Sequence, residues 1–241
     1  MKKQFLTLAF IVANVILLSQ TQINFPSTDK VTVYGNLYES TTKDAKIMLL
    51  CHQAGYSRGE YNETAPKFNT LGYTCLAIDQ RSGETVNNVT NLTAADAKSK
   101  NLPTTYLDAE QDIIAAVNYL FAKYGKKIIL VGSSYSSSLI IKVAASQTQK
   151  VESIISFSPG EYFDDQTLIT NNLKQLTIPV YITCAKDEIS DTQKLMIAPT
   201  SKNITFFKPK QAGKHGSKAL WAKNSNNKEY WDSLLNFLKS N

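Results

Sequence analysis

A serine at the junction of a strand-like and a helix-like run is the strongest chemical feature of this sequence. The apolar run 128–131 leads into Gly-Ser-Ser-Tyr-Ser, and a helical pattern follows. A tight turn of small residues between a buried strand and a helix is typical of a nucleophile elbow, which lifts one serine hydroxyl clear of the sheet. Gly132 and Ser136 flank Ser134, with Ser136 at the position where a second glycine is usual. We therefore predict that Ser134 is a nucleophile.

A serine hydroxyl needs a base before it can attack, and the chain has two histidines. His215 lies in a Gly-Lys-His-Gly sequence shortly after the last strand-like run. Its small neighbours allow the imidazole to approach the elbow, so we predict that His215 accepts the proton of Ser134. His52 follows another strand-like run, and we expect it to be a structural residue that hydrogen-bonds its own loop.

A carboxylate is needed to fix the imidazole tautomer. Asp187 and Glu188 both follow the apolar run 179–184 closely. We predict that Asp187 is this acid because it is nearer to the end of the strand, with Glu188 as the competing candidate. The chain order nucleophile, acid, base is the order found in α/β folds with an elbow serine.

Two backbone N–H groups should bind the negative charge that develops on an attacked carbonyl oxygen. One is the N–H of Tyr135, which directly follows the nucleophile. The second should come from the His-Gln-Ala-Gly sequence after the apolar run 47–51. We predict the Gln53 N–H as this donor, with Ala54 as the alternative.

These groups can meet if the elements between them form one sheet. Nearly all-apolar runs predict strands buried on both faces, at 46–51, 73–78, 127–131, 151–157, 178–184 and 203–208. Helical patterns lie between them, at 60–71, 113–121 and 138–146, and a closing helix includes 231–238. The fold class is therefore α/β, a mostly parallel twisted sheet with helices on both faces. Right-handed crossovers bring all the strand-to-helix loops to one edge.

Two other segments are less regular. The run 31–40 alternates apolar and polar residues and predicts an antiparallel edge strand or hairpin. Residues 82–103 are polar and are expected to form a long surface loop.

The N-terminus has the layout of a secretory signal peptide. Lys2 and Lys3 precede an apolar run at 5–18, which is shorter than the roughly 20 residues that a spanning helix needs. We expect a signal peptide at 1–20 and one domain at 21–241. The protein is then secreted or periplasmic, with no stable membrane insertion after cleavage; a membrane anchor is the alternative.

The charge distribution and the cysteine count indicate which classes of partner and cross-link to expect. The chain is 43% hydrophobic and carries a net charge of +6, but its lysines are spread along the sequence and do not indicate a nucleic-acid surface. Three cysteines cannot form a complete disulfide framework, and they lie in or beside apolar runs, so we expect free buried thiols.

With these residues assembled, the chain resembles the α/β-hydrolases, and among them the small dienelactone-hydrolase-like and esterase-like members. The resemblance covers nearly all of the chain after the N-terminal segment. It rests on His-Gln-Ala-Gly at 52–55, Asp-Gln-Arg-Ser-Gly at 79–83, the Ser134 elbow, Ser-Pro-Gly at 158–160, Asp187 and His215. It implies that Ser134 forms an acyl-enzyme that water, activated by His215, then hydrolyses. No metal or organic cofactor is implied. A dienelactone hydrolase proper has a cysteine nucleophile, so that reaction is not implied.

The expected function is hydrolysis of small carboxylic esters. A peptidase or amidase of the same fold usually adds a large gating domain, and a non-catalytic binding protein would have a broken triad; both remain alternatives. Only 18 residues, 160–177, separate two strands where lid insertions are common, which predicts a minimal lid and an open, shallow pocket. We predict that the rim of this pocket includes the substrate-binding residues Tyr56, Arg81 and Tyr162, together with Gln53 and Tyr135.

Overall fold

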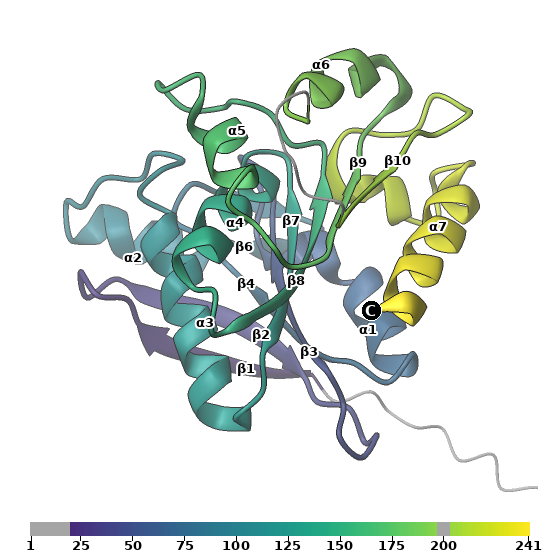
Figure 1. The fold of residues 1–241 in the computed structure, drawn as a ribbon. Helices are drawn as coiled ribbons and strands as arrows, with labels where there is room; N and C mark the ends of the chain where they lie inside the picture. Colours follow the sequence, from purple (N-terminus) through teal and green to yellow (C-terminus); the bar gives the residue numbers. More distant parts are fainter. Residues whose placement is uncertain (1–19, 197–202) are drawn as a thin grey trace, which may run out of the picture.

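A sheet of eight strands forms the centre of the computed structural model, which describes residues 20–196 and 203–241 (Figure 1). The strand order across the sheet is β1-β2-β4-β3-β7-β8-β9-β10. Their bounds are Gln20–Pro26 (β1), Thr32–Tyr38 (β2), Ile47–Cys51 (β3), Thr74–Ile78 (β4), Ile128–Ser133 (β7), Val151–Phe157 (β8), Val180–Thr183 (β9) and Ile204–Phe207 (β10).

The direction of the strands brings the loops that follow them together. Every pairing from β4 across to β10 is parallel, whereas β2 pairs antiparallel with both β1 and β4. Cys51 of β3 is level with Gly132 of β7, which is level with Ser156 of β8. The carboxyl ends of these strands therefore lie side by side, as the sequence predicts.

Helices cover both faces of the sheet (Figure 1). One face packs against α3 (Glu110–Tyr124), α4 (Tyr135–Ser146) and α5 (Leu168–Leu173), and the other against α1 (Thr64–Thr70) and α7 (Asn227–Ser240). Successive residues of β3 alternate between the two faces, so Leu49 packs on the α3 side and Leu50 on the α7 side. Burial on both faces explains why β3, β4 and β7 are almost entirely apolar.

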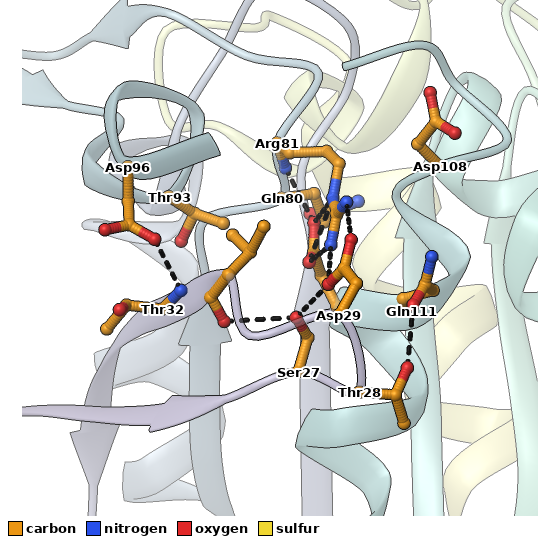
Figure 2. Close-up of polar contacts among 12 residues, drawn as sticks. Ser27, Thr28, Asp29, Thr32, Gln80, Arg81, Thr93, Asp96, Asp108 and Gln111 are labelled. Atoms are coloured by element: carbon orange, nitrogen blue, oxygen red, sulfur yellow. Dashed lines mark hydrogen bonds and ion pairs between the residues drawn. The ribbon is translucent and has the colours of Figure 1, made fainter. Parts of the chain in front are cut away.

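The segment 82–103 is more ordered than expected. It contains a two-stranded hairpin, β5 (Thr85–Val86) and β6 (Val89–Thr90), and the helix α2 (Leu92–Ser99). The side chain of Asn91 caps α2, and the Asp96 carboxylate accepts a hydrogen bond from the Thr32 N–H of β2 at 2.7 Å (Figure 2). Because α2 is built from alanines and polar residues, no stripe of large apolar side chains marks it in the sequence.

Arg81 lines a hollow of about 420 Å³ together with Ala54 and Tyr106, but its guanidinium is not available to a substrate, so the predicted substrate-binding role of this side chain is wrong. Its side chain is fully buried, with Nη1 2.5 Å from Oδ2 of Asp29 (Figure 2). Its Nη2 is 2.7 Å from Oδ1 of Asp112. Its hydrogen bonds to Asp29 hold the pKa of that carboxyl well below its ordinary value. A buried charge must be paired, and the two carboxylates that pair with Arg81 come from different parts of the fold. The guanidinium thus links the turn between β1 and β2 to α3.

The three cysteines are buried and free, in agreement with the expectation that they form no internal disulfide. Within the described residues, no helix is long and apolar enough to cross a bilayer. The predicted signal peptide, apart from residue 20, lies outside the described residues.

Candidate active site

Ser134 forms the sharp turn between β7 and α4. Its φ of 58° and ψ of −128° are a strained conformation for a residue with a side chain, and such strain is concentrated at functional sites. Gly132 makes the turn possible, because a Cβ at this position would lie 2.5 Å from Cα of Ser137. The local geometry is therefore that of the predicted elbow.

The serines around Ser134 have fixed hydrogen-bond partners of their own. Ser136 Oγ accepts from the Ser133 N–H at 2.9 Å and donates to the carbonyl oxygen of Cys51 at 2.8 Å. A serine in the usual glycine position thus joins the elbow to the end of β3. The hydroxyls of Ser137 and Ser138 donate to backbone carbonyl oxygens at 2.6 and 2.7 Å.

His215 lies between Ser134 and a carboxylate. Its Nε2 is 2.8 Å from Oγ of Ser134, and its Nδ1 forms a hydrogen bond with Oε1 of Glu188. The other oxygen of Glu188 accepts from Ser158 Oγ at 2.6 Å and from the Ala185 N–H at 2.9 Å. Burial alone would raise the pKa of Glu188, but these hydrogen bonds outweigh it and lower the pKa, which favours the charged carboxylate.

The predicted acid, Asp187, is not in contact with His215, and the competing candidate Glu188 takes its place. Both residues belong to a short 3₁₀ turn, η2 (Lys186–Glu188), that follows β9. Successive side chains of a 3₁₀ turn point about 120° apart, so proximity to the strand does not decide which one faces the site. Asp187 is exposed to solvent, whereas Glu188 is turned inward.

The loop that carries His215 depends on a glycine. Gly216 begins η3 (Gly216–Leu220) with a φ of 69°, and a Cβ there would overlap Oγ of Ser133. Its N–H donates to Ser158 Oγ at 2.9 Å, the same hydroxyl that donates to Glu188. Ser158 thereby connects the base loop to the acid, a role that no pattern in the sequence indicated.

The Gln53 N–H cannot bind an oxyanion, so this prediction is wrong. It donates to Oε2 of the buried Glu60 at 2.7 Å, a group only seven residues along the chain. The alternative, Ala54, has an N–H for which no hydrogen bond is recorded among the described residues.

The direction of the Ala54 N–H follows from His52. The carbonyl oxygen of Gln53 is 2.7 Å from Nδ1 of His52, while the Nε2 of His52 accepts from the Gln80 N–H at 2.9 Å. Burial lowers the pKa of His52, which suits a neutral ring that donates at one nitrogen and accepts at the other. In a trans peptide the N–H points opposite to the carbonyl, so the Ala54 N–H points away from His52. His52 is therefore a structural residue, as expected.

The other predicted oxyanion donor, the N–H of Tyr135, remains available. Tyr135 is the first residue of α4, and the N–H of a first helical residue has no acceptor within the helix. Its side chain is not part of the rim, because the ring is fully buried and its hydroxyl is bonded to Gln80 and Ser82. Tyr106 stacks on this ring, with the centroids 4.5 Å apart, and is 39% exposed. Nothing in the sequence marked Tyr106.

Tyr162 and Tyr56, both predicted at the rim, border two different hollows. Tyr162 is 37% exposed, donates to the carbonyl oxygen of Ser158 at 2.9 Å, and borders a polar hollow of about 550 Å³ that Glu188 also lines. Burial raises the pKa of Tyr162 to about 12, although the Ser134 hydroxyl acts in the opposite direction. Tyr56 borders a hollow of about 460 Å³ together with Lys214 and Lys218.

Within residues 20–196 and 203–241, no group of three or more histidine, cysteine, aspartate or glutamate side chains is placed to hold a metal ion.

Comparison with known proteins identifies the architecture. No protein-family model matches the chain, and no curated protein matches it. Among solved structures, an esterase from Pyrococcus furiosus is 16% identical, with 92% of this chain and 93% of that chain covered and a TM-score of 0.69. A dienelactone hydrolase from Anabaena variabilis is 15% identical, with 91% and 95% covered and a TM-score of 0.66.

The chain has the α/β-hydrolase fold. A thermostable carboxyl esterase from Bacillus coagulans is also similar, at 11% identity, with 93% and 99% covered and a TM-score of 0.69. Within this α/β-hydrolase fold, Ser134 follows a central parallel strand, and Glu188 and His215 follow later strands. The expected fold class is thus confirmed.

Proposed function

We propose that this protein is a serine hydrolase that cleaves small carboxylic esters through an acyl-enzyme intermediate. The observation that carries the proposal is the hydrogen-bonded series Ser134, His215 and Glu188, with Ser134 Oγ 2.8 Å from His215 Nε2. A nucleophile, a base that contacts it and a carboxylate that orients the base are the three groups that acyl transfer needs.

In the first step, Ser134 Oγ forms a bond to the carbonyl carbon of the ester and its proton passes to Nε2 of His215. The electron pair of the carbonyl bond moves to its oxygen, where the N–H groups of Ala54 and Tyr135 donate hydrogen bonds. The Glu188 carboxylate stabilises the imidazolium through Nδ1. The tetrahedral species then expels the alcohol, which takes the proton from His215.

In the second step, water replaces the alcohol. His215 Nε2 accepts a proton as the water oxygen attacks the acyl carbon, and it returns the proton to Ser134 Oγ as the carboxylic acid leaves. The same donors bind the second oxyanion. All proton transfers therefore use one imidazole, and the protein's own residues are sufficient for both steps.

Short acyl groups fit the surroundings of Ser134 best. The chain between β8 and β9 includes one six-residue helix, α5, as the minimal lid predicts. The hollow beside Tyr162 is open and lined largely by polar residues. Because each buried methylene adds about 0.8 kcal/mol only where apolar atoms enclose it, long chains gain little here.

Labelling with a fluorophosphonate probe tests the proposal. Wild type should be labelled once, at Ser134, and should hydrolyse p-nitrophenyl acetate. Ser134→Ala should abolish labelling and lower kcat by about a millionfold. Ser137→Ala is the matched control, because this hydroxyl donates to a backbone carbonyl and should be dispensable. An unlabelled wild type would favour a non-catalytic binding protein, and faster turnover of amides than of matched esters would favour a peptidase.

We further propose that the protein is exported. Support comes from the basic start and the apolar run at 5–18. The intact mass of protein recovered from outside the cytoplasm should correspond to a chain that begins near residue 20. A retained N-terminus would contradict this.

A further inference from the structure

Glu60 is a buried carboxylate that the proposed reaction does not use. It lies in the 3₁₀ turn η1 (Arg58–Tyr61) and is fully inaccessible to solvent. Among the described residues, no lysine, arginine or histidine forms an ion pair with it. A buried carboxylate without a counter-ion is costly unless hydrogen bonds satisfy its oxygens, so a residue of this kind calls for an explanation.

Three donors satisfy the carboxylate, and they come from three separate segments of the chain. Oε2 accepts from the Gln53 N–H at 2.7 Å. Oε1 accepts from Ser133 Oγ at 2.7 Å and from Ser217 Oγ at 2.6 Å. The Ser217 N–H also donates to Ser133 Oγ at 2.8 Å, which closes the network.

Each donor is one or two residues from an active group. Gln53 precedes Ala54, whose N–H is the proposed oxyanion donor. Ser133 precedes Ser134, and Ser217 follows His215 by two positions. A single carboxylate thus contacts the oxyanion loop, the nucleophile elbow and the base loop at once.

The turn that holds Glu60 is itself fixed. Trp221 Nε1 donates to the carbonyl oxygen of Glu60 at 2.9 Å, and Tyr61 Oη donates to the carbonyl oxygen of Cys51 at 2.7 Å. Ser57 caps the turn through the Gly59 N–H. The carboxylate therefore has little freedom to move away from its three donors.

We propose that Glu60 is a positioning residue that sets the oxyanion loop in register with Ser134 and His215. The inference rests on the proposed hydrolase function. By accepting from the Gln53 N–H, Glu60 fixes the peptide group between His52 and Gln53, while His52 Nδ1 fixes the peptide group between Gln53 and Ala54. The two contacts together direct the Ala54 N–H toward the developing charge. Such an effect is realised in the transition state and should appear in kcat more than in KM.

Three substitutions separate position from charge. Glu60→Gln keeps the length of the side chain and an acceptor for the Gln53 N–H, while the serine hydroxyls can turn to accept from its amide. Glu60→Asp keeps the charge but is one methylene too short to reach all three donors. Glu60→Ala removes every contact.

The assay is steady-state hydrolysis of p-nitrophenyl acetate, with the folded fraction measured by circular dichroism and the active fraction by fluorophosphonate titration. We expect Glu60→Ala to lower kcat by about 10²–10³-fold with KM nearly unchanged, as for loss of one oxyanion donor. Glu60→Asp should lose at least about tenfold, and Glu60→Gln should stay within about threefold of wild type. If Glu60→Ala does not fold, the Asp and Gln variants still decide the matter.

An active Glu60→Ala with unchanged kcat, a loss confined to KM, or a Glu60→Asp more active than Glu60→Gln would each overturn the proposal. The last result would mean that the charge, and not the position of the donors, is what matters. A wild type inert toward both the probe and all esters would instead overturn the proposed function, and this inference with it.

Discussion

Replacing Glu188 by glutamine should disable His215 while leaving the fold in place. In wild type, one oxygen of Glu188 accepts from Ser158 Oγ and the Ala185 N–H, and the other contacts His215 Nδ1. The Ala185 N–H can only donate, so the amide oxygen of the Glu188→Gln variant must occupy the position that accepts from this N–H and from Ser158 Oγ. The amide NH₂ then faces Nδ1, which has to become an acceptor.

The cost follows from this tautomer. With Nδ1 as acceptor, the proton of a neutral imidazole lies on Nε2, which then cannot accept the proton of Ser134. The equivalent change in a serine protease lowers kcat by about 10⁴-fold, or about 5.4 kcal/mol in the activation barrier. We expect a loss of this order for Glu188→Gln. Asp187→Asn should change kcat by less than about twofold, because Asp187 is exposed and does not contact His215.

The two variants should be compared on p-nitrophenyl acetate at neutral pH, with thermal unfolding as the test of the fold. The reasoning requires a large loss of kcat in Glu188→Gln although the variant is still folded at the assay temperature. It would be refuted by the reverse order, in which Asp187→Asn is inactive and Glu188→Gln retains activity. A loss in Glu188→Gln that only follows unfolding would also count against the tautomer argument.

Three further results are expected. Gly216→Ala should destabilise the fold by about 1–3 kcal/mol and reduce activity, because its Cβ would overlap Ser133 Oγ at positive φ. Gly125→Ala is the control in urea unfolding, because Gly125 has a similar φ but open space around it. Equal losses of stability in the two variants would rule out the overlap. The lowered pKa of Glu188 contributes stability that is present above the ordinary carboxyl pKa of about 4.3 and is lost as the pH falls through the folded-state value. The difference in unfolding free energy between wild type and Glu188→Gln should therefore shrink in acid, and a difference independent of pH would contradict this. Finally, kcat/KM for p-nitrophenyl esters should peak between acetyl and butyryl, whereas a steady rise to long chains would indicate a deep apolar channel.

The parts of the site that could be predicted from the sequence are those set by local patterns. Apolar runs mark the strands, and parallel strands bring their following loops to one edge, so the approach of His215 to Ser134 follows from the order of elements alone. The elbow is visible because its tight turn requires Gly132.

The remaining features depend on orientation or on distant partners. Whether Asp187 or Glu188 faces His215 is decided by the rotation of a three-residue turn. Whether Gln53 or Ala54 can donate is decided by Glu60, which occupies the first N–H. Arg81 is buried because Asp29, 52 positions earlier in the chain, reaches it. Side-chain contacts of this kind leave no periodic trace in a single sequence.

The five serines between residues 133 and 138 differ in the atom that receives their proton. Four of the hydroxyls donate to oxygen: Ser133 to a carboxylate, and Ser136, Ser137 and Ser138 to backbone carbonyls. None of those acceptors is a nitrogen base, so these four hydroxyls lack the partner that activates a serine for attack. Ser134 alone faces a nitrogen base. An electrophile that reacts with activated serines should therefore modify Ser134 and leave the four neighbouring serines unmodified, although all five side chains are the same.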